Sequence, residues 1–261
     1  MIGFLHRLLL LLFLGTLGSA SYSQTNKDKV KQLLEQATKA RETYKEDQAI
    51  QLYKQVLALE ASNLDALYNV GLLISRKGWL LEDTNEPLAI QYHKEALEWA
   101  KKTYKLYPNT FEGNVCMAAA IGRLAKYYDT KERVQSAWDI KKYADAAAKY
   151  NPSHPGLKHL LAWWNFELSK PTWLERSMAN MLFGGLPKGA DVKRAIQYMQ
   201  ELIKLNPNYT VYSYDLAKFY EYVGDKVKAI QCLKHVIGLK PVTPEDAPYI
   251  EAAKRFLKRL Q

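Results

Sequence analysis

The sequence predicts an all-α protein made of stacked helix–turn–helix repeats, and three observations support this fold class. The composition is rich in Ala, Leu, Lys and Tyr with few alternating β-branched residues, which favours helices over strands. Prolines and glycines stand at intervals that suit helix ends. A pattern of small, aromatic and apolar residues lies between Pro207 and Pro241, which are 34 residues apart.

The first 23 residues are predicted to be a signal peptide. A short segment ending in Arg7 precedes the apolar run Leu8 to Leu14, and small residues at 18–20 suit a cleavage site. Cleavage after Ser23, which would expose Gln24, fits equally well. Because the run is shorter than the about 20 residues of a membrane-spanning helix, an uncleaved anchor is the less favoured alternative. We therefore expect a periplasmic or secreted protein, with an N-terminally anchored one as the alternative.

The best-formed repeat covers residues 208–241. Ala217 and Ala229 are small residues where two helices would cross closely. Gly224 can adopt the left-handed conformation that ends a first helix, and Asp225 can cap the second helix. Pro241 then stops the second helix, because proline cannot continue it.

This pattern resembles the tetratricopeptide repeat (TPR), which implies a right-handed α-solenoid. Weaker copies at matching offsets precede it. Together they predict about five helix pairs, over residues 28–61, 63–108, 110–152, 154–207 and 208–241. A C-terminal helix should start at Thr243-Pro244-Glu245-Asp246, with the threonine as cap and the proline at the first helical position. We expect this helix to cover the open end of the last repeat.

Two repeats are longer than the others, so residues 24–261 are predicted to form one repeat domain with additions. The second repeat has an extended connection from Lys77 to Asn85. The fourth has a Trp-rich insertion at about 170–190, in which Trp173 to Phe183 shows helical spacing. Gly184-Gly185-Leu186-Pro187 is then a turn back into the array.

The insertion also resembles a narrower family, the regulators of microtubule dynamics. The resemblance covers about residues 65–260, and its most specific part is the Phe-Gly-Gly-Leu-Pro element at 183–187. It also includes Trp163 to Leu168, Trp173 to Arg176 and Thr243 to Asp246. The resemblance implies association with microtubules, organelle membranes and contact sites. Because the predicted export signal would keep this chain away from cytoplasmic microtubules, we interpret it as an exported, bacterial-type relative.

The sequence has none of the common catalytic motifs, such as G-x-S-x-G or a phosphate-binding glycine loop. His154 and His159 are five residues apart, on different faces of a helix, and there is no C-x-x-C pair. Cys116 and Cys232 have apolar helical surroundings, typical of small buried thiols. We therefore predict no enzyme activity, no cofactor and no metal.

Two features of the insertion have a plain structural interpretation. Trp163, Trp164 and Trp173 could line a pocket, but such residues more often fill the gap beneath an added helix. Glu167 and Glu175 flank the Trp-rich segment and could supply a hidden acid, although no second group in the sequence pairs with it.

In this repeat type the first helix of each pair lines a concave groove. The offsets place aromatic and basic side chains there, and three of these residues, Arg76, Arg123 and Lys218, could grip a carboxylate or an acidic peptide. The predicted groove residues are Tyr68, Arg76, Arg123, His159, Trp163, Tyr214, Lys218 and Tyr222.

The favoured function is therefore a non-catalytic protein-interaction scaffold in the cell envelope, with a protein or peptide partner in the groove. The net charge is +10, but cations and acids are mixed over many helices, which argues against nucleic acid as the partner. The alternative is a membrane-tethered structural or contact-site protein. It would use an uncleaved N-terminus and the basic C-terminal helix with Lys254, Arg255, Lys258 and Arg259.

Overall fold

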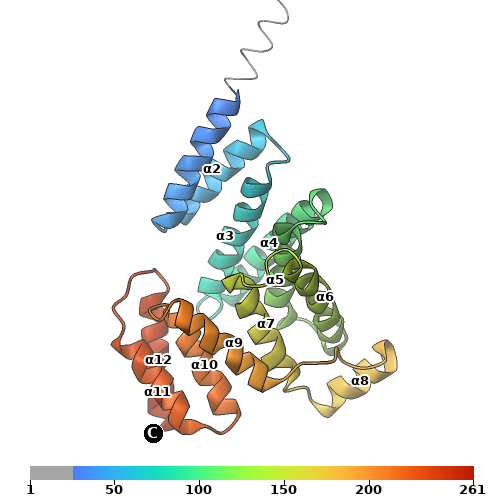
Figure 1. Cartoon of the computed structure of the whole chain (residues 1–261), viewed down its shortest axis with the longest axis vertical. Helices are drawn as coiled ribbons and strands as arrows, with labels where there is room; N and C mark the ends of the chain where they lie inside the picture. Colours follow the sequence, from blue (N-terminus) through green and yellow to red (C-terminus); the bar gives the residue numbers. More distant parts are fainter. Residues whose placement is uncertain (1–25) are drawn as a thin grey trace, which may run out of the picture. The chain divides into compact units, whose positions relative to one another are not determined.

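The computed structural model describes residues 26–261, and every regular element in that range is a helix (Figure 1). This confirms the predicted all-α class. The predicted signal peptide at residues 1–23 lies outside the described residues. Within the described range, no helix combines the length and the apolar character that crossing a bilayer requires. The helices are residues 26–42, α2 (Glu46–Leu59), α3 (Leu64–Leu81), α4 (Glu86–Leu106), α5 (Phe111–Ala125), α6 (Thr130–Ala148), α7 (Pro155–Leu168), α8 (Trp173–Phe183), α9 (Val192–Leu205), α10 (Thr210–Tyr222), α11 (Lys226–Gly238) and α12 (Asp246–Leu260).

The chain divides into two compact units, with the boundary between Val70 and Gly71 inside α3. The first unit contains the helix at 26–42, α2 and the start of α3. Tyr53 is fully buried in its core, and Arg41 donates a hydrogen bond of 2.8 Å from Nη1 to Asn69 Oδ1.

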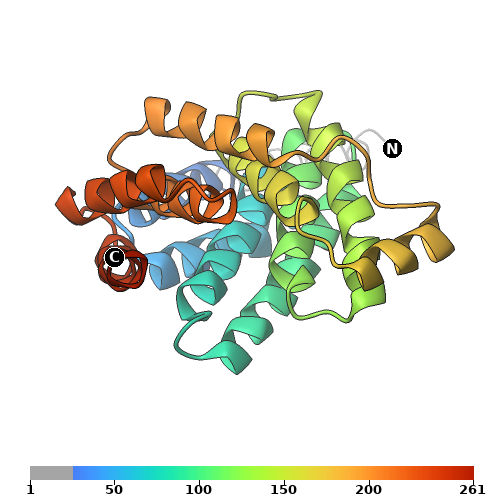
Figure 2. The same cartoon turned by 90° about the horizontal axis from the view of Figure 1, so that it is seen from below.

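The second unit contains the rest of α3 from Gly71 onward and all the helices that follow it. Each helix from α4 onward packs against its neighbour in the chain, apart from the inserted α8, which packs against α6. The first helices of successive pairs also meet, since α5 contacts α7 (Figure 2). Contacts between neighbouring repeats of this kind are the basis of a solenoid. The five pairs are the helix at 26–42 with α2, α3 with α4, α5 with α6, α7 with α9, and α10 with α11.

The last repeat has the predicted local chemistry. Gly224 has a φ of 79°, the left-handed conformation that ends α10. Asp225 Oδ1 accepts a 3.1 Å hydrogen bond from the backbone N–H of Lys228 and so caps α11. Ala217 and Ala229 are fully buried, as close helix crossings require.

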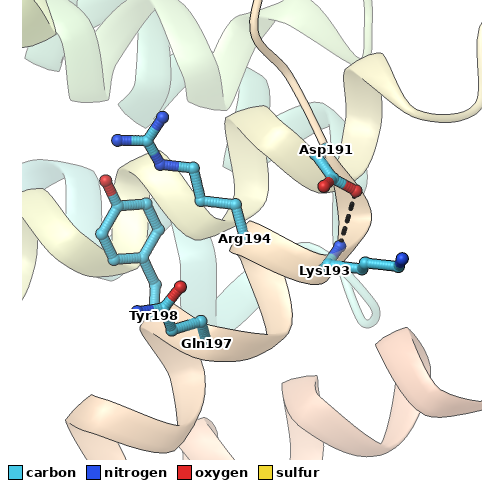
Figure 3. A pocket seen from close by; sticks show the side chains of 5 residues that line it. All are labelled: Asp191, Lys193, Arg194, Gln197 and Tyr198. Atoms are coloured by element: carbon cyan, nitrogen blue, oxygen red, sulfur yellow. Dashed lines mark hydrogen bonds between the residues drawn. The ribbon is translucent and has the colours of Figure 1, made fainter.

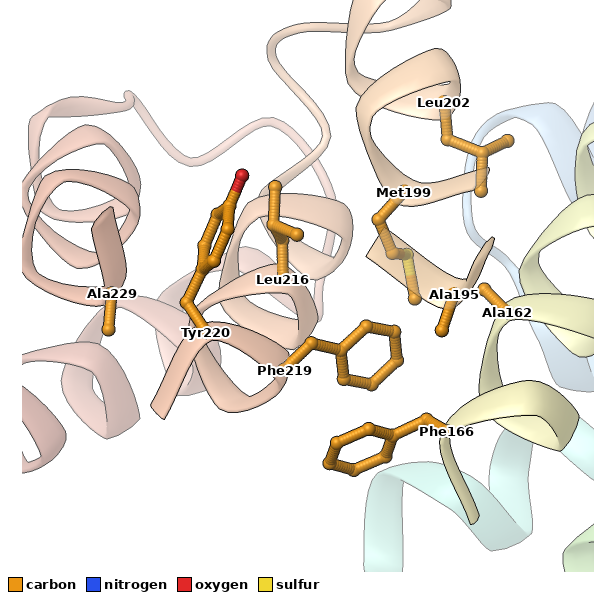
Figure 4. Packing of buried hydrophobic residues seen from close by; sticks show 9 residues of the cluster. All are labelled: Ala162, Phe166, Ala195, Met199, Leu202, Leu216, Phe219, Tyr220 and Ala229. Atoms are coloured by element: carbon orange, nitrogen blue, oxygen red, sulfur yellow. The ribbon is translucent and has the colours of Figure 1, made fainter. Parts of the chain in front are cut away.

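A hydrophobic core joins α7, α9 and α10 (Figure 4). Phe166 and Phe219 stack with ring centroids 4.1 Å apart. Met199 and Leu202 of α9 are fully buried beside them. This core holds the face of α7 and α10 on which the candidate site lies.

Two predicted boundaries are wrong. Residues 77–81 are not part of a connection but continue α3 to Leu81. Gly78 lies inside α3, where the helix packs closely against His93 of α4. A Cβ at this position would come within 2.7 Å of the imidazole, so the close approach requires glycine. The C-terminal helix begins at Asp246 rather than at Thr243. Asp246 Oδ2 accepts hydrogen bonds from the backbone N–H groups of Val242 and Thr243, so the acid organises this helix start.

The predicted helix in the insertion, α8, is confirmed. Its start has a capping box, in which Glu175 N–H donates to Thr172 Oγ1 at 3.3 Å and Thr172 N–H donates to Glu175 Oε2 at 2.7 Å. Gly184 ends the helix with a φ of 68°. Arg133 of α6 forms an ion pair with Glu175 and ties α8 to the array. Both candidates for a hidden acid therefore have structural partners, since Glu167 pairs with Lys170 at 2.7 Å as Glu175 does with Arg133.

Candidate functional site

The second unit gathers a set of charged and aromatic side chains from four first helices and from α12. We call this set the inner cluster. Eight of its members contact one another in an unbroken series of hydrogen bonds, ion pairs and ring contacts. The Arg76–Glu245 ion pair joins this series through the 3.1 Å backbone hydrogen bond that Tyr249 N–H donates to the Glu245 carbonyl. The members are Arg76 and Trp79 of α3, Arg123 of α5, His159 and Trp163 of α7, Tyr214, Asp215 and Lys218 of α10, Glu245 just before α12, and Tyr249 of α12.

Asp215 is the acidic centre of the inner cluster, with 4% of its side chain exposed. Its Oδ2 lies 3.0 Å from His159 Nε2 and accepts a 2.9 Å hydrogen bond from Trp163 Nε1. Its Oδ1 lies 3.2 Å from Lys218 Nζ. Burial alone would raise the pKa of this carboxyl, but the Lys218 charge and the His159 hydrogen bond outweigh it and lower the pKa. An ionised Asp215 therefore fixes side chains of α7 and α10 in place.

Glu245 is a second buried carboxylate, with 3% of its side chain exposed. It forms an ion pair with Arg76, which is 169 residues away in the sequence. Tyr209 donates a 3.4 Å hydrogen bond from its hydroxyl to Glu245 Oε1. Burial, and next the Glu245 charge, raise the pKa of Tyr209. The ion pair connects α3 to the segment that enters α12.

Aromatic rings join the same helices. The Arg123 guanidinium lies 5.1 Å from the ring centroid of Trp79. Trp79 is 5.6 Å from Tyr249, and Tyr249 is 5.0 Å from Tyr214 in an edge-to-face arrangement. Lys218 Nζ lies 4.5 Å from the Tyr214 ring. The C-terminal helix therefore does more than end the array, because it also supplies a ring to the inner cluster.

Six of the eight groove residues predicted from the sequence belong to the inner cluster. Tyr222 is 47% exposed and lies nearby on α10, where its hydroxyl donates a 3.0 Å hydrogen bond to the Ser169 carbonyl. Tyr68 is half-buried on α3 and belongs to the first unit. The six within the cluster are Arg76, Arg123, His159, Trp163, Tyr214 and Lys218. A binding role for all eight stays a prediction.

The three predicted cations have partners within the chain. Arg76 pairs with Glu245 and Lys218 with Asp215, and Arg123 Nη1 lies 3.9 Å from Glu82 Oε1. Glu245 and Glu82 were missed in the sequence because no local spacing marks them as partners of Arg76 and Arg123. Asp215 is different, because it stands three residues before Lys218 on the same helix, a spacing that could have indicated the pair. All three cationic side chains are partly exposed to solvent. The exposed fraction of the side chain is 22% for Arg76, 34% for Arg123 and 35% for Lys218. The charge that this face presents to solvent is therefore mainly positive.

Glu82 has three cationic or imidazole neighbours. Its Oε1 is 2.9 Å from His93 Nε2, and its Oε2 is 2.8 Å from Lys126 Nζ. Burial would raise its pKa, but the hydrogen bonds from His93 and Lys126 and the Arg123 charge lower it. This carboxylate is thus another ionised anchor at the edge of the inner cluster.

The remaining candidates have structural explanations. Trp164 is buried and donates a 3.0 Å hydrogen bond from Nε1 to the Ala137 carbonyl, which is packing rather than a pocket lining. Cys116 and Cys232 are free thiols. Among residues 26–261, no group of three or more His, Cys, Asp or Glu side chains could hold a metal ion.

A hollow on α9 is lined by none of the inner-cluster residues (Figure 3). At the edge of this hollow, the backbone N–H of Lys193 donates a 2.9 Å hydrogen bond to Asp191 Oδ1. It is an open surface depression, and its side chains are those of one helix and its cap. They are Asp191, Lys193, Arg194, Gln197 and Tyr198.

Paired helices, left-handed glycine helix ends and first helices that share one face define a TPR-like α-solenoid. The sequence profile of the regulator of microtubule dynamics proteins 1-3 matches residues 33–261. The chain belongs to this family.

Individual members of the family share about a quarter of their residues with this chain in the aligned regions. Regulator of microtubule dynamics protein 1 of Pongo abelii is 27% identical over 181 residues, which is 69% of this chain and 56% of that protein. Regulator of microtubule dynamics protein 3 of Rattus norvegicus is 27% identical over 192 residues, covering 72% of this chain and 40% of that protein. The chain thus spans about half the length of these relatives.

A solved structure supports the fold. A thermophilic TPR protein from Thermus thermophilus superposes with a TM-score of 0.56 and 16% identity. The match covers 87% of this chain and 99% of that one. At this identity the similarity concerns the fold alone.

Proposed function

We propose that the protein is a non-catalytic scaffold that binds a protein or peptide partner on the face formed by the inner cluster and Tyr222. One observation carries the proposal: tryptophan, tyrosine and basic side chains of successive repeats meet on one face and stay partly exposed. Tryptophan, tyrosine and arginine are the residues that most often dominate binding energy at protein interfaces.

The buried carboxylates support this role. Asp215 fixes His159, Trp163 and Lys218 before any partner arrives. A side chain that is already ordered loses less entropy on binding, which improves affinity. The positive charge exposed on this face favours partners with acidic groups, although the internal pairs reduce that preference.

We also propose that the scaffold acts in the cell envelope. The support is the predicted signal at residues 1–23. Mass spectrometry of the N-terminus of the mature protein tests this location. A chain starting at Ser21 or Gln24 is expected, whereas an intact N-terminus starting at Met1 would contradict an exported, cleaved form.

Affinity capture from envelope extracts tests the binding face. We choose the double variant Arg123→Gln with Lys218→Gln, because glutamate at these positions would face Glu82 and Asp215 and could unfold the protein. The matched control is Lys94→Gln with Lys234→Gln, which removes two exposed cations from second helices, α4 and α11.

The proposal expects a partner that the wild type and the control retain and that the double variant loses by about tenfold or more. Thermal unfolding of all three proteins checks that the folds are equal. Equal capture by the double variant and the control would contradict a role for this face.

A further inference from the structure

The three cations predicted for the groove differ in how far the chain itself uses their N–H donors. Arg76 forms its ion pair with the buried Glu245 carboxylate. Lys218 Nζ lies 3.2 Å from Asp215 Oδ1 and 4.5 Å from the centroid of the Tyr214 ring. Each of these two cations is therefore matched by a buried carboxylate of its own, which balances its charge within the protein.

Arg123 of α5 is different, because its guanidinium makes no hydrogen bond with any residue in the described range 26–261. Its ion pair with Glu82 is loose, since the 3.9 Å between Nη1 and Oε1 exceeds hydrogen-bonding distance. A guanidinium carries five N–H donors in a planar fork that matches the two oxygens of a carboxylate. With 34% of this side chain exposed, its donors are open to an anionic group of a partner.

Aromatic contacts hold this guanidinium in place. Its central carbon lies 5.1 Å from the centroid of the Trp79 ring, and Trp79 in turn lies 5.6 Å from the Tyr249 ring. A guanidinium that lies over an aromatic face can still donate from its edge. Arg123 is therefore positioned before a partner arrives, which lowers the entropy lost on binding.

Lys126 adds a second cation next to Arg123. It follows three residues later at the end of α5, its Nζ lies 2.8 Å from Glu82 Oε2, and its side chain is 47% exposed. No other carboxylate of the described residues pairs with either cation. The imidazole of His93, 2.9 Å from Glu82 Oε1, adds no negative charge. Two cations thus share one carboxylate, which leaves an excess of at least one positive charge.

We propose that Arg123, with Lys126 beside it, binds an aspartate or glutamate side chain of the partner. The inference rests on the proposed scaffold function and names the chemical group that the scaffold recognises. The excess of one positive charge matches a singly charged carboxylate. A phosphate group, with about two negative charges, would need a further cation beside this pair.

NMR of the arginine side chains tests the proposal on the full nitrogen-15-labelled chain. The Nε–Hε signals are followed while a short capped peptide with a central glutamate is added, and matched peptides carry glutamine or phosphoserine instead. Arg123→Lys keeps the charge and removes the fork, so its missing signal assigns Arg123. Lys126→Gln removes the second cation. Lys94→Gln is the matched control, because it removes an exposed cation of α4.

We expect the Arg123 signal to move saturably at a lower concentration of the glutamate peptide than the signal of any other arginine. The glutamine peptide should leave it in place. The half-saturating concentration should rise about threefold or more in Lys126→Gln and stay within about 1.5-fold in Lys94→Gln. Thermal unfolding checks each variant, and the comparison among arginines in the wild type does not depend on the fold of Lys126→Gln.

An arginine other than Arg123 that responds first, or an equal response of Arg123 to the glutamine peptide, would overturn the proposal. Binding of the phosphoserine peptide about tenfold or more tighter than the glutamate peptide would instead identify a phosphate site.

Affinity capture separates this proposal from the scaffold proposal. If the single variant Arg123→Gln retains a partner that the double variant with Lys218→Gln loses, the scaffold stands and the Arg123 carboxylate site fails. If the Arg123 signal responds as expected but the double variant and its control capture equally, the carboxylate site stands and the scaffold fails.

Discussion

Replacing Asp215 by alanine removes the centre of the inner cluster. The change would leave Trp163 Nε1 without its 2.9 Å acceptor and the His159 and Lys218 groups without their shared carboxylate. Removing one partner of a buried ion pair costs about 3–5 kcal/mol. Lys218 and His159 are partly exposed, at 35% and 21%, so water can compensate part of the loss. We therefore expect a destabilisation of about 3 kcal/mol, at the lower end of that range.

For a unit of this size, about 3 kcal/mol corresponds to a fall in melting temperature of about 6–12 °C. Circular dichroism of the full chain during heating measures it. Asp145→Ala is the control, because Asp145 is 54% exposed in an i,i+4 ion pair with Lys141. Loss of such a surface pair should cost less than about 1 kcal/mol.

The lowered pKa of Asp215 also predicts how the stability difference between wild type and an Asp215 variant depends on pH. In the unfolded chain an aspartate titrates near about 3.9. The stabilisation by the ionised carboxylate is therefore fully present above that pH and is lost as the pH falls toward the lower folded pKa. The stability gap between wild type and Asp215→Asn should be constant from about pH 5 to 7 and shrink below about pH 4. A gap that grows on acidification, or an Asp215→Ala cost equal to that of Asp145→Ala, would refute the reasoning.

Two further predictions concern glycines and thiols. Gly113→Ala should destabilise by about 2 kcal/mol or more, because the new Cβ would lie 2.1 Å from the Tyr107 carbonyl oxygen. Gly122→Ala on the same helix should instead stabilise the protein by about 0.5–1 kcal/mol, since the atom nearest to the new Cβ would be 3.8 Å away. Urea unfolding measures the change in the free energy of unfolding for both variants. Changes of the same sign in the two variants would contradict the prediction. Burial raises the pKa of the Cys116 thiol to about 12 and that of Cys232 to about 11. Native protein at about pH 8 should therefore react with iodoacetamide far more slowly than urea-unfolded protein, and equal rates would show that burial does not control these thiols.

Much of the fold could be predicted because its signals are local. Gly224 and Asp225 mark a helix end and a helix start within a few residues, and the structure confirms both. The helix at Trp173–Phe183 follows from its own periodicity. The start of α12 was misplaced because a threonine before a proline looks like a cap, whereas the nearby Asp246 accepts the backbone hydrogen bonds.

The inner cluster was harder to predict because its contacts are not local. Offsets along first helices placed Arg76, Arg123 and Lys218 on a common face, but they could not reveal the distant carboxylate partners of Arg76 and Arg123. The partner of Lys218, Asp215, is local and could have been found from its i,i+3 spacing. The partner of Arg76 is 169 residues away, and only tertiary packing brings α12 back to α3. Sequence periodicity gives the face on which a side chain lies and leaves its partner open.

The most direct measurement of the central claim is site-specific photo-crosslinking in cells. A photoreactive phenylalanine analogue replaces Tyr222, which is 47% exposed beside the inner cluster, or Tyr150, which is 51% exposed at the end of α6. If the face of the first helices binds the partner, a defined protein adduct forms at position 222 and is missing at position 150. Adducts that are the same at both positions, or that form at position 150 alone, would contradict the proposed scaffold face.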